Sequence, residues 1–191
     1  MVTLREVDEG LKAVLERLVY INRKGEKAPV GVVYSTPEKA FARDVRRELP
    51  FVSFFRVSAM PNPERFNAFI RPWYGVPARR EDGNYEITKF TPVDLQYQVD
   101  VWCKFYSDVS FLQTQLIHWF SYGGKINCAG LLFPVFLEDL SDLSQLESDS
   151  DDRLLRFSAT LRIESWLSAD ERFERKFEIW HILLGLYPSN R

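Results

Sequence analysis

The stretch at residues 90–120, FTPVDLQYQVDVWCKFYSDVSFLQTQLIHWF, changes its hydrophobic period part-way along. Up to Tyr106 the residues alternate between two faces of a strand. One face is apolar: Leu95, Tyr97, Val99, Val101, Cys103 and Phe105. The other face is Gln96, Gln98, Asp100, Trp102, Lys104 and Tyr106. From Phe111 the apolar spacing becomes helical. The stretch predicts a strand over 94–106 with its apolar face in the core, followed directly by a helix over 107–122.

The remaining periodic segments place this strand in an α+β protein. Thr3 opens a capping box with Glu6, and an apolar stripe then runs from Leu4 to Val19, which predicts a first helix. A second helix is expected after Ser35, with Pro50 as its stop. Further strands are predicted over 28–35, 51–59, 129–140 (where Pro134 indicates an edge or bulge), 154–167 and 177–187. These elements predict one domain over 1–191, a mainly antiparallel sheet with helices packed on one face.

The segment between the strands at 51–59 and 94–106 is rich in proline and glycine. It predicts two extended arms with a protruding loop around 71–84. The loop concentrates basic and aromatic residues: Arg71, Trp73, Tyr74, Arg79 and Arg80. Such residues stack single-stranded bases, and they are also typical anchors of protein interfaces. The formal net charge of −2 favours a protein partner. A nucleic-acid-binding module and a loop folded back on its own domain remain the alternatives.

Composition and motifs give no indication of an active site. The 191 residues are 46% hydrophobic and 27% charged, which is ordinary for a globular chain. Neither His118 nor His181 has a metal ligand at usable spacing, and the acidic stretch 146–152 lacks the glycine and final glutamate of a calcium loop. Cys103 and His118 form a nucleophile pair only with a partly exposed thiol, and the strand pattern buries that thiol. We expect no cofactor, no metal and no enzymatic activity.

Compartment follows from the same features. Cys103 and Cys128 do not form a secreted disulfide framework, so buried reduced thiols are expected. The charged N-terminus is not a signal peptide, and no window reaches the ~20 apolar residues of a membrane span. The expectation is a soluble protein made in a reducing cytoplasm.

The order of the elements resembles the tail-terminator and tail-sheath-stabiliser family found at the head-proximal end of contractile phage tails. APVGVVYSTPEKAFA is similar to the early strand and helix start of that family, and TPVDLQYQVDVWCKFYSDVSFLQTQLIHWF to its strand that runs into an aromatic-ended helix. LLRFSATLRIESWL and RKFEIWHILLGLY resemble a later long strand and the closing strand. Together these segments cover more than half of the chain.

The resemblance implies a homohexameric ring in the virion, assembled in the host cytoplasm. Such a ring caps the tail tube, anchors the last sheath layer and docks to the head-side connector, with genomic DNA only as cargo. The polar strand face would then form wet contacts between subunits, which makes Gln96, Gln98 and Trp102 candidate interface residues. Another neck protein and the terminator of a non-contractile tail stay open, as do a nucleic-acid-binding module and an enzyme of another class.

Overall fold

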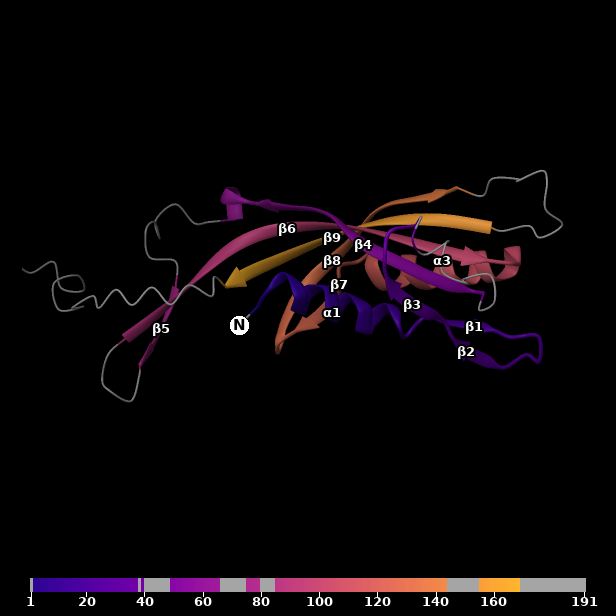
Figure 1. Cartoon of the computed structure of the whole chain (residues 1–191), viewed down its shortest axis with the longest axis horizontal. Helices are drawn as coiled ribbons and strands as arrows, with labels where there is room; N and C mark the ends of the chain where they lie inside the picture. Colours follow the sequence, from indigo (N-terminus) through magenta and orange to yellow (C-terminus); the bar gives the residue numbers. More distant parts are fainter. Residues whose placement is uncertain are drawn as a thin grey trace, which may run out of the picture.

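A mixed β-sheet with two helices on one side forms the body of the protein (Figure 1). The computed structural model describes residues 2–37, 39, 49–65, 75–79, 85–143 and 155–168, with the side chains of 75–79, 85–90 and 168 excluded. Within these residues the sheet has seven strands in the order β3-β4-β6-β9-β8-β7, with β5 paired to β6 outside this path. Only the β3–β4 pair is parallel. The predicted fold class, a mainly antiparallel α+β protein with helices on one face, is confirmed.

The first helix, α1 (Leu4–Leu15), begins as its capping box predicts. The Thr3 side chain accepts from the Glu6 N–H and the Glu6 carboxylate accepts from the Thr3 N–H, so two otherwise unpaired donors are satisfied. Val7, Leu11 and Leu15 are fully buried. Asp8 ties the helix to the sheet, because the Tyr97 hydroxyl donates to its Oδ1 at 2.6 Å.

The predicted continuation of this helix to Val19 is wrong, because the chain forms a hairpin there. Strands β1 (Val19–Ile21) and β2 (Lys27–Pro29) pair antiparallel. The turn is stabilised by Asn22, whose Oδ1 accepts from the N–H groups of Lys24 and Glu26 at 2.9 and 3.0 Å. Gly25 supplies the positive φ of 79° that this turn requires.

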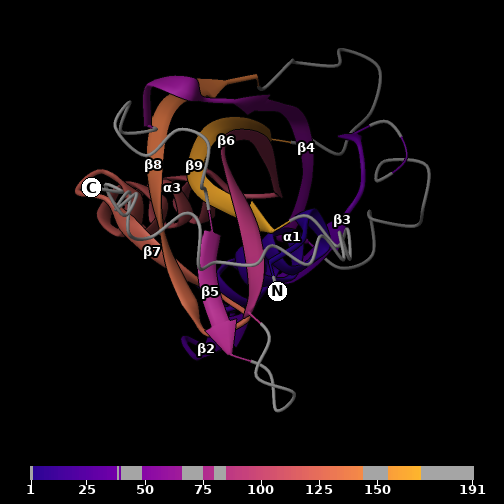
Figure 2. The same ribbon diagram turned by 90° about the vertical axis from the view of Figure 1, so that its left-hand side faces the viewer.

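Four long strands make the centre of the sheet. They are β4 (Phe51–Pro61), β6 (Tyr85–Cys103), β9 (Leu155–Ser168) and β8 (Leu131–Asp142). The short strands are β3 (Gly31–Tyr34) at one edge, β7 (Gly124–Cys128) at the other, and β5 (Gly75–Arg79) beside the first part of β6. Pro134 lies just before β8 begins to pair with β9 at Val135, so on that side it needs no ladder N–H. Viewed along its length, the sheet is strongly twisted and curled (Figure 2).

Strand β6 confirms the predicted inward face over most of its length. Leu95, Tyr97, Val99 and Val101 have no exposed surface, whereas Gln96 and Gln98 are half-buried and Lys104 is exposed. The prediction for Phe105 is wrong. The strand ends at Cys103 and Phe105 is the N-cap of the following helix, which leaves its ring 45% exposed.

The second helix, α3 (Tyr106–Phe120), packs on the same side of the sheet as α1 (Figure 1). Its buried residues, Val109, Leu112, Leu116 and Phe120, follow helical spacing and join the core. Gln115 fixes the β1–β2 hairpin to the helix. Its amide nitrogen donates to the Val19 carbonyl at 2.8 Å, and its amide oxygen accepts from the Val19 N–H at 3.3 Å.

Two predicted elements fall largely or wholly outside the described residues: the helix after Ser35 and the strand at 177–187. A short 3₁₀ turn, η2 (Pro63–Arg65), follows β4. Among the residues with a described structure, no helix has the length and apolar character needed to cross a bilayer.

Candidate interaction surface

The sheet has one face that carries neither helix, and we call it the helix-free face. Because side chains alternate, it is lined by the polar half of each long strand. Gln96 and Gln98 of β6 lie on this face, opposite Arg162 and Thr160 of β9. The other face of the same strands is apolar and fully buried, as at Val99 and Leu161. The two faces therefore have opposite chemistry.

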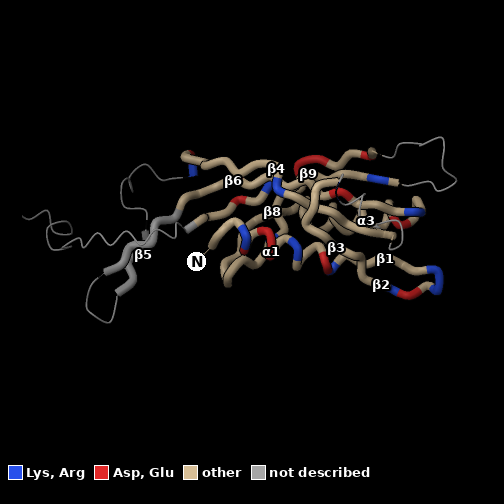
Figure 3. The backbone as a smooth tube through the Cα atoms, in the orientation of Figure 1, with Lys and Arg blue, Asp and Glu red and all other residues tan. Residues whose placement is uncertain are grey.

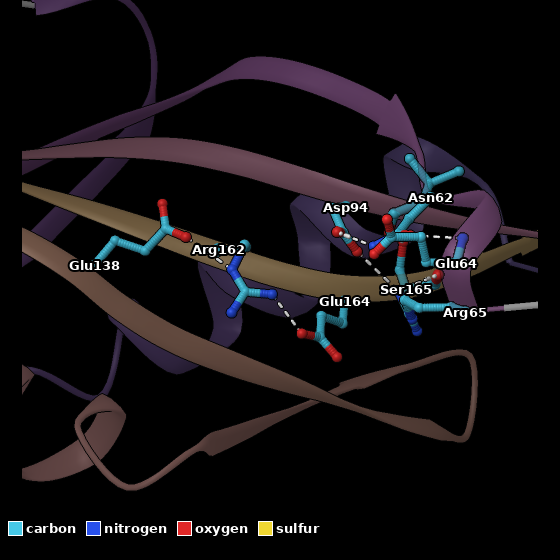
Figure 4. A network of polar contacts seen from close by, with 9 residues as sticks. Asn62, Glu64, Arg65, Asp94, Glu138, Arg162, Glu164 and Ser165 are labelled. Carbon is cyan, nitrogen blue, oxygen red and sulfur yellow. Dashed lines mark hydrogen bonds and ion pairs between the residues drawn. The ribbon is translucent and has the colours of Figure 1, made fainter.

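An arginine-centred network spans three strands in the middle of the helix-free face (Figure 4). Arg162 Nε donates to Glu138 Oε1 at 2.7 Å, and Arg162 Nη1 donates to Glu164. Gln96 Nε2 donates to the second oxygen of Glu138 at 3.3 Å. Burial alone lowers the pKa of Arg162, but the hydrogen bonds to Glu164 and Glu138 outweigh it and raise the pKa. The Arg162 guanidinium also lies 4.9 Å from the centre of the Phe136 ring.

A second network fixes the η2 turn to the sheet (Figure 4). The Asp94 carboxylate accepts from Asn62 Nδ2 at 2.7 Å and from Arg65 Nη1 at 2.9 Å. Arg65 lies over the Trp166 ring at 5.4 Å and also donates to the Ser165 carbonyl at 3.4 Å. The chain that leaves β4 is thus held against β6 and β9 before it departs at residue 66.

A third network surrounds a fully buried carboxylate, Asp100. Arg156 donates to Asp100 Oδ1 from Nε at 3.2 Å and from Nη2 at 2.9 Å. Gln98 Nε2 lies 3.2 and 3.1 Å from the two carboxylate oxygens. A buried charge requires this kind of compensation, because desolvating an unpaired carboxylate is very costly.

Trp102 was predicted as an exposed interface residue, and this is wrong: only 6% of it is exposed. The cross-strand register places Arg156 directly opposite, and its guanidinium lies 4.8 Å from the centre of the indole ring. The indole N–H donates to Ser53 Oγ at 3.3 Å on the other neighbouring strand. Trp102 is therefore part of the subunit's own structure.

The basic and aromatic loop residues are placed only in part. Arg71, Trp73, Tyr74 and Arg80 lie outside the described residues, and Arg79 ends β5 without a described side chain. The prediction that prolines keep this segment out of regular structure is wrong for 75–79, which pairs with β6 and sets Pro77 opposite Ile87. An edge strand tolerates proline because one side of it needs no hydrogen bond. The predicted pair of extended arms is thus present as a hairpin that extends beyond the body (Figure 1).

The side chains considered for catalysis are not arranged for it. Cys103 and Cys128 are buried, and burial raises the pKa of their thiols to about 12 and about 11. A thiol with such a pKa stays protonated at neutral pH and is a poor nucleophile. His118 is exposed on α3, and His181 lies outside the described residues. Within the described part of the chain, no group of three His, Cys, Asp or Glu side chains could hold a metal ion.

No known protein family matches the chain, and no curated protein matches its sequence. The arrangement of residues therefore has to carry the functional argument. What it offers is a pre-ordered polar surface, with one ion-pair centre on each of Asp94, Asp100 and Arg162. Sequence alone could not find these centres, because each depends on which strands are neighbours and in which register.

Proposed function

We propose that this chain is a structural subunit of a phage tail. Copies of it form a ring at the head-proximal end of a contractile tail. The ring ends the tail tube, stabilises the last layer of the sheath and joins the tail to the neck. Its partners are other copies of the chain, the tube and sheath proteins and the head-side connector, and genomic DNA only passes through.

The observation that carries the proposal is the two-faced sheet. Its apolar face is closed by α1 and α3, so the helix-free face is the broad surface left for contacts with other chains. Side chains already held by ion pairs, such as Arg162, lose little conformational freedom on association. Polar and half-buried residues such as Gln96 and Gln98 suit the wet, hydrogen-bonded contacts of an assembly that forms from soluble parts. The resemblance of the element order to tail terminators gives this surface its role.

A tube-capping assay tests the proposal. Tail-tube subunits of the same phage are polymerised with and without the purified chain, and tube lengths are measured by electron microscopy. The proposal predicts shorter tubes that carry extra density at one end. Unchanged lengths and bare ends would reject a terminator, and binding to the head-side connector alone would support a neck protein in its place.

A variant pair links the assay to the surface. Gln96→Lys combined with Gln98→Lys adds two charges to the helix-free face, and we expect the subunit to fold but to lose capping. The matched control is Gln113→Lys on α3, which makes the same chemical change on the helical side and should leave capping intact.

A further inference from the structure

The turn of the β1–β2 hairpin presents a basic surface that has no ion-pair partner in its own chain. We define the basic tip as residues 22–27, NRKGEK, where three cations and one carboxylate give a net charge of +2. Residues 23–27 are all exposed. Within the described residues, the ion pairs of the chain do not include Arg23, Lys24 or Lys27. Figure 3 shows these charges at one end of the molecule.

Exposed aromatic side chains lie beside the basic tip. The Arg23 guanidinium is 5.7 Å from the centre of the Phe105 ring. Phe105 is 45% exposed and Tyr106 is 62% exposed. Arginine and exposed aromatic residues together are typical anchors of protein interfaces. Gln115 holds the hairpin against α3 through both backbone groups of Val19, so the tip is presented in a fixed position.

The same chain contains a complementary charge. We define the acidic segment as residues 147–152, ESDSDD, where four carboxylates and no cation give a net charge of −4. It lies between the end of β8 and the start of β9, which are held together where the Leu143 N–H donates to the Arg156 carbonyl at 2.9 Å. In Figures 1 and 3 these strand ends lie at the same end of the molecule as the basic tip, but on the opposite side of the sheet.

Two complementary patches on opposite sides of one end suit a head-to-tail ring. In such a ring each subunit uses one patch on its first neighbour and a different patch on its second neighbour. We propose that the basic tip, with Phe105 and Tyr106, binds the acidic segment of the next copy. This inference rests on the proposed ring and names the contact that closes it. The overall net charge of −2 favours this partner over DNA, since a carboxylate on the neighbour competes for the same cations.

Charge reversal and its repair test this contact. Reversing the tip (Arg23→Glu, Lys24→Glu, Lys27→Glu) sets like charges against each other, and so does reversing the segment (Glu147→Lys, Asp149→Lys, Asp151→Lys, Asp152→Lys). We expect each variant to weaken assembly at least roughly tenfold, measured as the dissociation constant by light scattering. A single chain that carries both sets should assemble again, because opposite charges then face each other. Lys125→Glu on β7 is the control for reversal elsewhere and should assemble normally.

The outcomes separate this contact from the proposed function. Circular dichroism and thermal melting first confirm that each variant is folded, and the repaired chain tests the contact even where a single reversal is unstable. Rings that survive both reversals would overturn the contact and leave the ring proposal standing. The same holds if tip reversal abolishes binding to a labelled DNA duplex while assembly is unchanged. A native chain that stays monomeric in low salt would overturn both.

Discussion

Single residues show where the pattern of the sequence was sufficient and where it was not. Val99 and Val101 are buried as the alternation predicts, because a strand with one apolar face has only one favourable orientation. Trp102 and Asp100 follow the same alternation yet are also buried. Their burial depends on Arg156, which lies 56 residues from Asp100 in the sequence and reaches it only through the β6–β9 register. A period of two residues contains no information about that register.

The ion pair between Asp100 and Arg156 supports a first prediction, on stability. Asp100→Ala leaves a mostly buried guanidinium without its carboxylate, which should lower the free energy of unfolding by about 3 kcal/mol. Urea denaturation of the isolated subunit measures the change. Lys12→Ala, which breaks the exposed Lys12–Glu16 pair, is the control and should barely move the unfolding midpoint. Equal shifts in the two variants would contradict the importance of the buried network.

The buried thiols support a second prediction, on pH. The pKa of Cys103 is raised to about 12 and that of Cys128 to about 11, both by burial, with the charges of Asp108 and Glu6 adding to the effect. An unfolded thiol releases its proton near pH 8.5. The unfolded chain therefore holds fewer protons above that pH, so stability is complete below it and falls as the pH rises.

The measurement is unfolding free energy from about pH 8 to pH 10 with a reductant present. The wild-type chain should lose stability as soon as the pH passes about 8.5. In Cys103→Ala combined with Cys128→Ala the decline should start later, near pH 10, where the buried Tyr97 hydroxyl, whose pKa is raised by burial, takes over. Identical pH profiles for the two proteins would refute the assignment.

Elements were predictable in proportion to their length and periodicity. The capping box of α1 and the long alternations of β6 and β9 carry their own signals, so both were recognised. The strands β1, β2 and β7 have three to five residues each, too few for a period to appear. The turn between β7 and β8 gave a weak signal, since Ala129 and Gly130 adopt the positive φ angles of 50° and 86° that a two-residue hairpin favours.

The packing of α1 on β7 supports a third prediction. A Cβ added at Gly10 would lie 2.7 Å from Cys128 Sγ and 2.8 Å from the Asn127 carbonyl oxygen. Gly→Ala in an exposed helix interior normally stabilises by about 1 kcal/mol. Here we expect the opposite sign and a lower melting temperature, because the helix has to move away from the β7 backbone. Ser110→Ala at an exposed position of α3 is the control, and a Gly10→Ala chain that melts higher would contradict this packing.

At the scale of the whole molecule, the sequence predicted the fold class but not the polar surface. Helices on one face follow from the one-sided apolar strands, whereas the ion-pair centres at Asp94, Asp100 and Arg162 require strand order and register. The β5–β6 hairpin shows a third case. Its composition indicated a loop, but the pairing of 75–79 with β6 overrides the effect of a single proline.

The aromatic loop residues give a fourth prediction, on assembly. Arg71 and Trp73 lie outside the described residues, so the argument is compositional: a merely solvated loop has no reason to concentrate them. Arg71→Ala combined with Trp73→Ala should leave the melting temperature of the subunit unchanged and impair ring or tail formation, since such anchors are each worth about 2 kcal/mol or more at an interface. Electron microscopy and thermal melting are read together. Normal assembly would exclude the loop as an anchor, and a collapsed melting temperature would assign it to the core.

The most direct test of the central claim is the mass and symmetry of the purified chain in solution. Native mass spectrometry gives the number of copies, and averaged electron micrographs give the symmetry. The account predicts a closed ring of six copies with a central opening, formed alone or on the end of a tail tube. A chain that remains a monomer or dimer, both alone and with tubes present, would contradict it.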